Sequence, residues 1–140
     1  MQTFHSHSEA ETEKLAENFA KTLHGGEVIA FRGGLGMGKT AFTRGLARGL
    51  GNSSFVSSPT FAIVNDYGGN PRLYHFDMYR ISGIDDLESV GFFDYMNDSS
   101  VLCIEWSENI EFALPENTIY IEFERTGENE RIITIHEGEK

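Results

Sequence analysis

The eight residues 33–40, GGLGMGKT, decide how this chain folds. Gly33, Gly38, Lys39 and Thr40 satisfy the Walker A pattern, G-x-x-x-x-G-K-[ST], which cradles the phosphates of a nucleotide. Its glycines let backbone N–H groups point at phosphate oxygens, its lysine reaches the β- and γ-phosphates, and its threonine hydroxyl binds Mg²⁺. The apolar run EVIAFR precedes the motif and a helical pattern follows it, which predicts a strand, a phosphate-binding loop and a helix in that order.

Two amphipathic helices are predicted around this strand and loop. Ser8 and Glu11 form the S-x-x-E pattern of a capping box, and apolar residues then recur every four positions up to Leu23. This pattern predicts a helix of about four turns that ends at the glycine pair 25–26. The same period after the Walker motif predicts a second helix over 39–51.

The second half of the chain is predicted to consist mainly of strands. They cover residues 61–67, 72–80, 101–106, 117–124 and 131–137. Turn residues predict hairpins between the first two and between the last two, whereas the unbroken run VLCIEW is typical of a strand buried on both faces. Residues 85–96 predict a further helix. The prediction is a single α/β domain over residues 1–140: a P-loop NTPase-like mixed β-sheet, parallel at its centre with an antiparallel hairpin edge, flanked by helices.

Charge and composition narrow the class of partner. The chain has 11 basic and 22 acidic residues, a formal net charge of −11. It is not expected to grip a nucleic-acid backbone unaided, because that needs clustered Lys and Arg, and the acidity suits either solubility or an acidic docking surface. No apolar run reaches the roughly 18 residues of a membrane span, and the first residues lack the pattern of a secretory signal. The lone Cys103 lies in an apolar run, so a cytoplasmic protein with a buried thiol is expected.

A Walker site also needs a carboxylate near the metal, at the end of a neighbouring strand. Two acids qualify. Glu105 ends four unbroken apolar residues, which favours it for the Walker B position, and Asp77 ends the more polar run RLYHF. Asp77 is then expected nearby, where it holds a metal-bound water or the attacking water. An exposed strand end is the alternative interpretation of both acids.

Two further positions have several interpretations. Thr60, in VSSPTF, lies in the first long loop after the Walker helix, where phosphate-sensing proteins place a switch ordered by the γ-phosphate and Mg²⁺. Pro59 restricts that loop, although Ser-Pro-Thr is also an ordinary turn. Trp106 directly follows Glu105. Three interpretations are open for its side chain: packing on the nucleotide, contact with a partner protein, or ordinary packing within the protein.

Four motifs in series, GGLGMGKT, SSPTF, YHFDMYR and CIEWSE, resemble those of the bacterial TsaE (YjeE) family. That family comprises small P-loop ATPases of the tRNA threonylcarbamoyladenosine pathway, and the resemblance covers residues 8–135. It implies ATP rather than GTP, and the sequence contains no [NT]-K-x-D motif for reading guanine. It also implies two partner proteins, a TsaD-type transferase and a TsaB-type companion, which modify an adenosine next to the anticodon. By the same resemblance, the protein is expected to hydrolyse ATP to reset this complex and to meet tRNA only through it.

Motif by motif, the resemblance implies a role for each residue of the loop and the metal site. The phosphate-binding residues are Gly34, Leu35, Gly36, Met37, Gly38, Lys39 and Thr40. Thr40 and Glu105 hold Mg²⁺, and Asp77 lies near the metal and the γ-phosphate. Gly34 stands where relatives usually have aspartate, and Met37 where they usually have alanine. Neither change removes a phosphate-binding group.

The resemblance also implies roles for four residues outside the Walker loop. Thr60 matches the switch threonine, and Trp106 lies near the nucleotide site in relatives. Thr12 resembles a family threonine near the adenosine. Arg131 resembles a C-terminal arginine that approaches the nucleotide.

The expected activity is slow, Mg²⁺-dependent hydrolysis of ATP to ADP. Mg²⁺ and Lys39 neutralise charge on the leaving phosphate, while Asp77 or Thr60 orients the attacking water. No arginine finger can be assigned, so stimulation by a partner is expected. Two alternatives stay open. One is a small-molecule P-loop kinase, for which no acceptor site is visible in so short a chain, and the other is a nucleotide-dependent binding module with negligible turnover.

Overall fold

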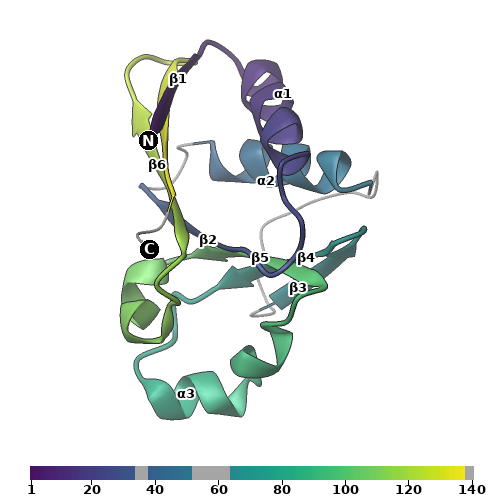
Figure 1. Ribbon diagram of the computed structural model, residues 1–140. Coiled ribbons are helices and arrows are strands. Elements are labelled where there is room, and N and C mark those ends of the chain that lie inside the picture. Colours follow the sequence, from purple (N-terminus) through teal and green to yellow (C-terminus); the bar gives the residue numbers. More distant parts are fainter. Residues whose placement is uncertain (34–37, 52–63, 138–140) are drawn as a thin grey trace.

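A sheet of seven strands runs through the described part of the protein, which in this computed structural model comprises residues 1–33, 38–51 and 64–137. The strands are β1 (Gln2–Ser6), β2 (Val28–Arg32), β3 (Val64–Gly68), β4 (Arg72–Asp77), β5 (Ser100–Glu105), β6 (Ile119–Arg125) and β7 (Arg131–His136). The helices are α1 (Glu9–Ala20), α2 (Lys39–Gly49), α3 (Ile84–Ser89) and the 3₁₀ helices η1 (Phe92–Tyr95) and η2 (Ser107–Ala113). Figure 1 shows α1 and α2 on one side of the central strands and α3 on the other.

The strand order is β1-β7-β6-β2-β5-β4-β3. The four central strands, from β6 to β4, are parallel to one another, and the remaining strands pair antiparallel with their neighbours. This arrangement confirms the predicted parallel centre and antiparallel edge, and the predicted hairpins are β3–β4 and β6–β7. Residues 61–63, where the first hairpin is predicted to begin, lie outside the described residues.

The sequence does not predict β1. This strand pairs antiparallel with β7, from Gln2 opposite Ile135 to Ser6 opposite Arg131. Its residues, QTFHS, include one large apolar side chain, Phe4, which packs against the core beneath α1 and α2. Because its partner strand is at the other end of the chain, no local pattern identifies this segment as a strand.

Two predicted helices end earlier than their apolar periodicity indicates. α1 ends at Ala20 instead of continuing to 25–26, and tighter turns follow, in which Leu23 N donates to Ala20 O at 3.0 Å. The prediction of a continuous helix over 85–96 is wrong, because Gly91 divides it into α3 and η1. The φ of Gly91 is 72°, in the left-handed region that ends helices.

Ser8 caps the N-terminus of α1 as predicted, but the Glu11 side chain does not bond to the partner that a capping box gives it. Ser8 Oγ accepts a hydrogen bond from Glu11 N at 3.1 Å, as a capping box requires. The Glu11 carboxylate accepts from His7 N at 2.9 Å rather than from Ser8 N. This bond holds the pKa of Glu11 below its usual range.

Two apolar cores lie on opposite faces of the sheet, because its central strands are buried on both faces. β5 contributes Val101 and Cys103 to the core under α1 and α2, and Leu102 and Ile104 to the core under α3 and the 3₁₀ helices. Every residue of β5 is buried, which confirms the prediction from the run VLCIEW up to Glu105, whereas Trp106 lies beyond the strand and is exposed. Burial also raises the pKa of the Cys103 thiol, so this cysteine is an unreactive core residue. In the ranges that the structure describes, no helix combines the length and apolarity needed to span a membrane.

Small residues let α1 and α2 approach each other closely. A Cβ atom on Gly45 would lie 2.2 Å from the backbone O of Glu13 and 2.6 Å from the Cβ of Ala16. These distances are far shorter than van der Waals contact, and a helical backbone cannot give way as a flexible side chain does. We expect Gly45→Ser to lower the free energy of unfolding by about 2 kcal/mol or more, measured by urea denaturation.

The same substitution at Gly83 is the matched control. Gly83 has an extended φ of −176°, and no atom lies within 4 Å of a Cβ added there. It is the N-cap residue of α3, a position that favours serine. Gly83→Ser should change the free energy of unfolding by less than about 0.5 kcal/mol. If both variants unfolded at the urea concentration of the parent protein, the close packing of α1 on α2 would be wrong.

Candidate functional site

The carboxyl ends of three parallel strands form one edge of the sheet, where the Walker loop begins. β2 leads into Gly33, and β5 lies beside it with Ala30 opposite Ile104. β4 lies beside β5, and their last residues, Asp77 and Glu105, are register partners. Ligands of open α/β sheets bind outside the carboxyl ends of the parallel strands. The two predicted acids and the start of the predicted phosphate loop therefore meet at the edge that such ligands use.

Lys39 is the first residue of α2 and is buried. Its Nζ donates a hydrogen bond to the backbone O of Gly33 at 3.0 Å, so the side chain folds back towards the beginning of the Walker loop. Thr43 Oγ1 donates to Lys39 O at 2.8 Å within the helix. An ammonium has three N–H donors, so its bond to one carbonyl is compatible with binding phosphate oxygens at the same time.

Thr12 and Arg131, two predicted site residues that lie far apart in the sequence, both lie beside Gly38, the N-cap residue of α2. Its φ of 95° is left-handed, so a residue with a side chain would be strained there. A Cβ on Gly38 would lie 3.9 Å from Arg131 Cγ and Phe123 Cδ2, and 4.0 Å from Thr12 Cγ2. Thr12 and Arg131 are thus adjacent to the end of the Walker loop.

The polar groups of these two residues have partners elsewhere. Thr12 is buried, and its hydroxyl is 2.7 Å from the Ser6 hydroxyl, a bond that ties α1 to β1. Arg131 Nη1 donates to backbone O atoms in the β6–β7 turn, the closest being Glu130 O at 3.0 Å. The structure places the stems of Thr12 and Arg131 beside Gly38, while their polar ends support the surrounding strands.

Glu105 is buried at the end of β5, and its partner is a histidine for which the sequence predicts no role in the site. His75 Nε2 is 2.6 Å from Glu105 Oε2, and the His75 side chain is completely buried. Its Nδ1 is 3.4 Å from the hydroxyl of Tyr67, on β3. A histidine two residues before Asp77 was visible in the sequence, but its role depends on the register between β4 and β5.

Asp77 has a different environment from Glu105. It is half-buried, and its Oδ1 accepts a hydrogen bond from Tyr79 N at 3.0 Å, which fixes the turn after β4. Met78 N donates to Glu105 O at 3.0 Å and links the ends of the two strands. Glu105 lies on the strand next to β2, and Asp77 lies one strand further away.

Trp106 is the only non-glycine residue with a positive φ in the part of the chain that the structure describes. Its φ is 59° and its ψ is 38°, directly after Glu105 and at the start of η2. The indole ring packs on Tyr79 at 4.8 Å between ring centroids and is partly exposed. Left-handed backbone at a bulky residue costs on the order of 1–3 kcal/mol and is often found at functional sites.

The donor set suits a metal that shares its ligands with phosphates. Among residues 1–33, 38–51 and 64–137, no group of three or more His, Cys, Asp or Glu side chains is placed to hold a metal ion. Mg²⁺ usually binds one or two carboxylates, keeps several waters and takes its other ligands from substrate phosphates. One buried carboxylate, Glu105, and one hydroxyl, Thr40, at the start of α2 fit that pattern.

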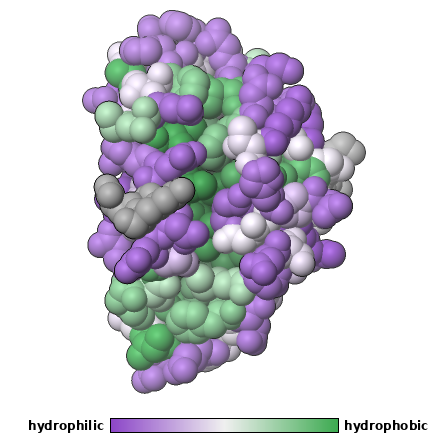
Figure 2. Space-filling view, in the orientation of Figure 1, coloured by the Kyte–Doolittle hydropathy of each residue, from purple (hydrophilic) through white to green (hydrophobic). Residues whose placement is uncertain are grey.

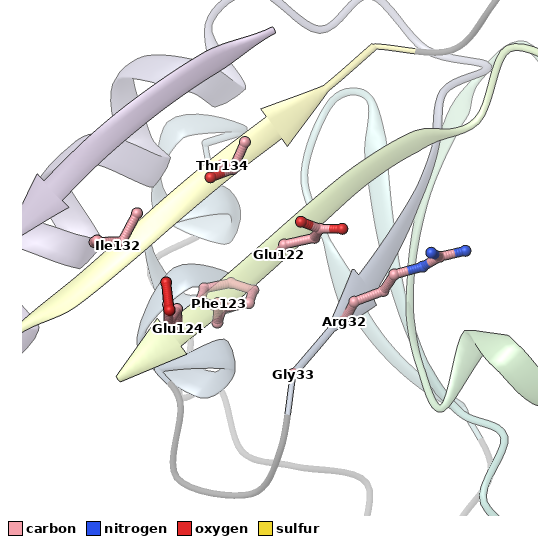
Figure 3. Close-up of a pocket in the computed structure, with 7 residues that line it drawn as sticks. All are labelled: Arg32, Gly33, Glu122, Phe123, Glu124, Ile132 and Thr134. Atoms are coloured by element: carbon pink, nitrogen blue, oxygen red, sulfur yellow. The ribbon is translucent and has the colours of Figure 1, made fainter. Parts of the chain in front are cut away.

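A pocket of about 380 Å³ lies beside Gly33, the first residue of the Walker loop. Its lining comes from β2, β6, β7 and the first residue of the loop, as Figure 3 shows: Arg32, Gly33, Glu122, Phe123, Glu124, Ile132 and Thr134. Two of these side chains are carboxylates, which repel phosphate. Arg32 is engaged by Glu111 and lies 4.4 Å from the centre of the Tyr120 ring. This pocket is therefore not the predicted nucleotide site.

Five predicted site residues, Gly34, Leu35, Gly36, Met37 and Thr60, lie outside the described residues. Their roles stay predictions from the motifs.

Comparison with known proteins supplies the family. A family model described as threonylcarbamoyl adenosine biosynthesis protein TsaE matches residues 6–133. The tRNA threonylcarbamoyladenosine biosynthesis protein TsaE of Bacillus subtilis (strain 168) is 41% identical over 126 residues, which cover 89% of this chain and 78% of that protein. The protein of the same name from Aquifex aeolicus (strain VF5) is 40% identical over 132 residues, which cover 92% of this chain and 91% of that protein.

The fold has a solved relative as well. A crystal structure of Bacillus subtilis YdiB matches with a TM-score of 0.82 and 34% sequence identity, covering 99% of this chain and 86% of that one. The sequence match and the structural match both extend over nearly all of the chain, and they confirm the resemblance noted from the four motifs. This chain belongs to the TsaE family of tRNA threonylcarbamoyladenosine biosynthesis proteins.

Proposed function

We propose that this protein binds and slowly hydrolyses ATP with Mg²⁺, and that hydrolysis resets a TsaD-type and TsaB-type transferase complex during threonylcarbamoyl modification of tRNA. The observation that carries the proposal is the meeting of three groups at one edge of the sheet. Buried Lys39 reaches back to Gly33 at the start of the Walker loop, and the carboxylates of Glu105 and Asp77 end the two neighbouring strands. A lysine at the Walker loop and carboxylates at the ends of nearby strands are the groups that a metal–triphosphate complex requires.

The residues of the chain have separate tasks in this proposal. Lys39 neutralises negative charge on the β- and γ-phosphates, and the N-terminus of α2 presents its backbone N–H groups to the same anion. Thr40 and Glu105 would hold Mg²⁺, which when bound supplies further charge neutralisation. Asp77 and Thr60 are the two candidates for orienting the attacking water, and of these only Asp77 lies among the described residues.

Ion pairs hold three of the arginines of this chain, which supports slow turnover by the isolated protein. Arg44 and Arg48 pair with Glu13 on α1, and Arg72 pairs with Asp66 at 2.9 Å. Arginines engaged in this way are poorly suited to move onto a phosphate in the transition state. A partner that supplies an arginine would raise hydrolysis on the order of 10³-fold or more.

A protein partner, rather than direct binding of tRNA, fits the surface. The net charge of −11 opposes binding to a phosphate backbone. Large apolar side chains are exposed in the turn after β4, on η2 and on α3: Tyr79 and Phe112 are each 60% exposed, and Ile84 is 47% exposed. Figure 2 shows an apolar area on the lower part of one face, below a mainly hydrophilic surface. Exposed apolar groups of this kind are common in protein contact surfaces.

Phosphate release from ATP, measured without any acceptor molecule, tests this proposal. The isolated protein should release phosphate slowly and only with Mg²⁺, and the TsaD-type and TsaB-type proteins should accelerate the release. The small-molecule kinase makes the opposite prediction. If phosphate transfer required an added acceptor and no hydrolysis occurred with or without the partners, the ATPase proposal would be wrong.

A further inference from the structure

His75 is a buried polar side chain that the proposed reaction does not use directly. It lies on β4 with no exposed surface, between Tyr67 on β3 and Glu105 on β5. Burying a polar ring costs free energy unless its nitrogens are hydrogen-bonded. Both ring nitrogens face polar atoms, at 2.6 Å and 3.4 Å, so the position is built around the imidazole.

The hydrogen bonds around His75 run in one direction. Asn65 Nδ2 donates to the Tyr67 hydroxyl oxygen at 3.2 Å, and that hydroxyl lies 3.4 Å from His75 Nδ1. We assign the imidazole proton to Nε2, because an ionised Glu105 carboxylate only accepts and its Oε2 is 2.6 Å from this nitrogen. The donor order is therefore Asn65, Tyr67, His75 and finally Glu105, across three adjacent strands.

We propose that His75 is a positioning residue that holds the Glu105 carboxylate in the orientation needed to bind Mg²⁺. The proposal rests on the proposed function, in which Glu105 is the metal ligand. A glutamate side chain has several rotamers, and a 2.6 Å bond to a ring fixed by a neighbouring strand selects one of them. Partners of this type, which orient metal ligands, typically change metal affinity by 10–100-fold when removed.

Binding rather than turnover provides the test. Mg²⁺ is titrated against the protein with a fluorescent, non-hydrolysable ATP analogue. His75→Phe keeps a ring but removes the donor, and it should raise the half-saturating Mg²⁺ concentration about tenfold or more. His75→Gln restores an N–H at a similar distance from the backbone and should stay within about threefold of the parent protein. Binding of the analogue without Mg²⁺ should be equal in all three proteins, because Lys39 is unchanged.

Two controls separate the possible failures. His5→Phe makes the same change at an exposed position on β1 and should leave the Mg²⁺ titration unchanged. Glu105→Gln should raise the Mg²⁺ requirement. If Glu105→Gln had no effect, the metal site and the role of His75 would both be wrong. If Glu105→Gln acted and His75→Phe did not, only the role of His75 would be overturned.

A measurement on the protein without ligands covers the case in which His75→Phe does not fold. Long-range ¹H–¹⁵N spectra of the imidazole rings report which nitrogen carries the proton. The hydrogen-bond order predicts a proton on His75 Nε2 that exchanges slowly with water. A proton on Nδ1 with Nε2 unprotonated would contradict the donation to Glu105 and overturn the proposal.

Discussion

Replacing Lys39 with alanine should weaken ATP binding by roughly 10–100-fold, because a hydrogen bond to a charged group is worth about 1.5–3 kcal/mol. Lys39 is the single buried lysine among the described residues, and its Nζ is 3.0 Å from Gly33 O at the start of the Walker loop. Calorimetric titration with ATP and Mg²⁺ measures the affinity. Thermal unfolding of the variant should be recorded with it, because the substitution removes buried stem atoms as well as the charge.

Lys14→Ala is the matched control for this result. Lys14 is exposed on α1, so its replacement removes the same charge away from the sheet edge. Its effect on ATP affinity should be less than about twofold, since charges on the surface are screened by salt. A folded Lys39→Ala variant that bound ATP as the parent protein does would contradict the assignment of the phosphate site.

Glu105→Gln should raise the Mg²⁺ concentration needed for ATP binding by about tenfold or more and reduce hydrolysis at a fixed Mg²⁺ concentration. The substitution removes the charge of the carboxylate while its amide oxygen still accepts the bond from His75. The fold should therefore persist, and the change in Mg²⁺ requirement should come from the metal site. Magnesium titrations of analogue binding and of phosphate release provide the measurement.

Asp77→Asn makes the corresponding change on the adjacent strand. Because Asp77 is half-buried, lies one strand further from β2 and caps the turn at Tyr79, we expect slower hydrolysis with little change in the Mg²⁺ requirement. The opposite pattern, with Mg²⁺ dependence altered by Asp77→Asn and unaffected by Glu105→Gln, would show that the roles of the two acids are reversed.

The sequence predicts the centre of the fold well because the signals there are local. The Walker motif marks the β2–α2 connection, and the unbroken run VLCIEW marks a strand buried on both faces. Signals at the edges are not local. β1 becomes a strand only by pairing with β7 at the other end of the chain, and α3 ends where Gly91 adopts a left-handed conformation that periodicity does not reveal.

The candidate site is predictable to the extent that each residue belongs to a motif. Glu105 and Asp77 are found because each ends a strand, and the structure pairs them in register. The contribution of His75 depends on which face of β4 meets β5, so a single sequence shows only a polar residue inside a strand. Thr12 and Arg131 are predicted as site residues only through the family resemblance. Sequence spacing does not identify them, because their positions beside Gly38 depend on how α1 and β7 pack around α2.

In the proposed function, ATP hydrolysis by this protein lets the transferase complex work repeatedly. The most direct measurement is reconstitution with the TsaD-type and TsaB-type proteins and tRNA, counting modified tRNA per complex with ATP and with a non-hydrolysable analogue. We expect many rounds of modification with ATP and about a single round with the analogue. Equal numbers of rounds with the two nucleotides would contradict it.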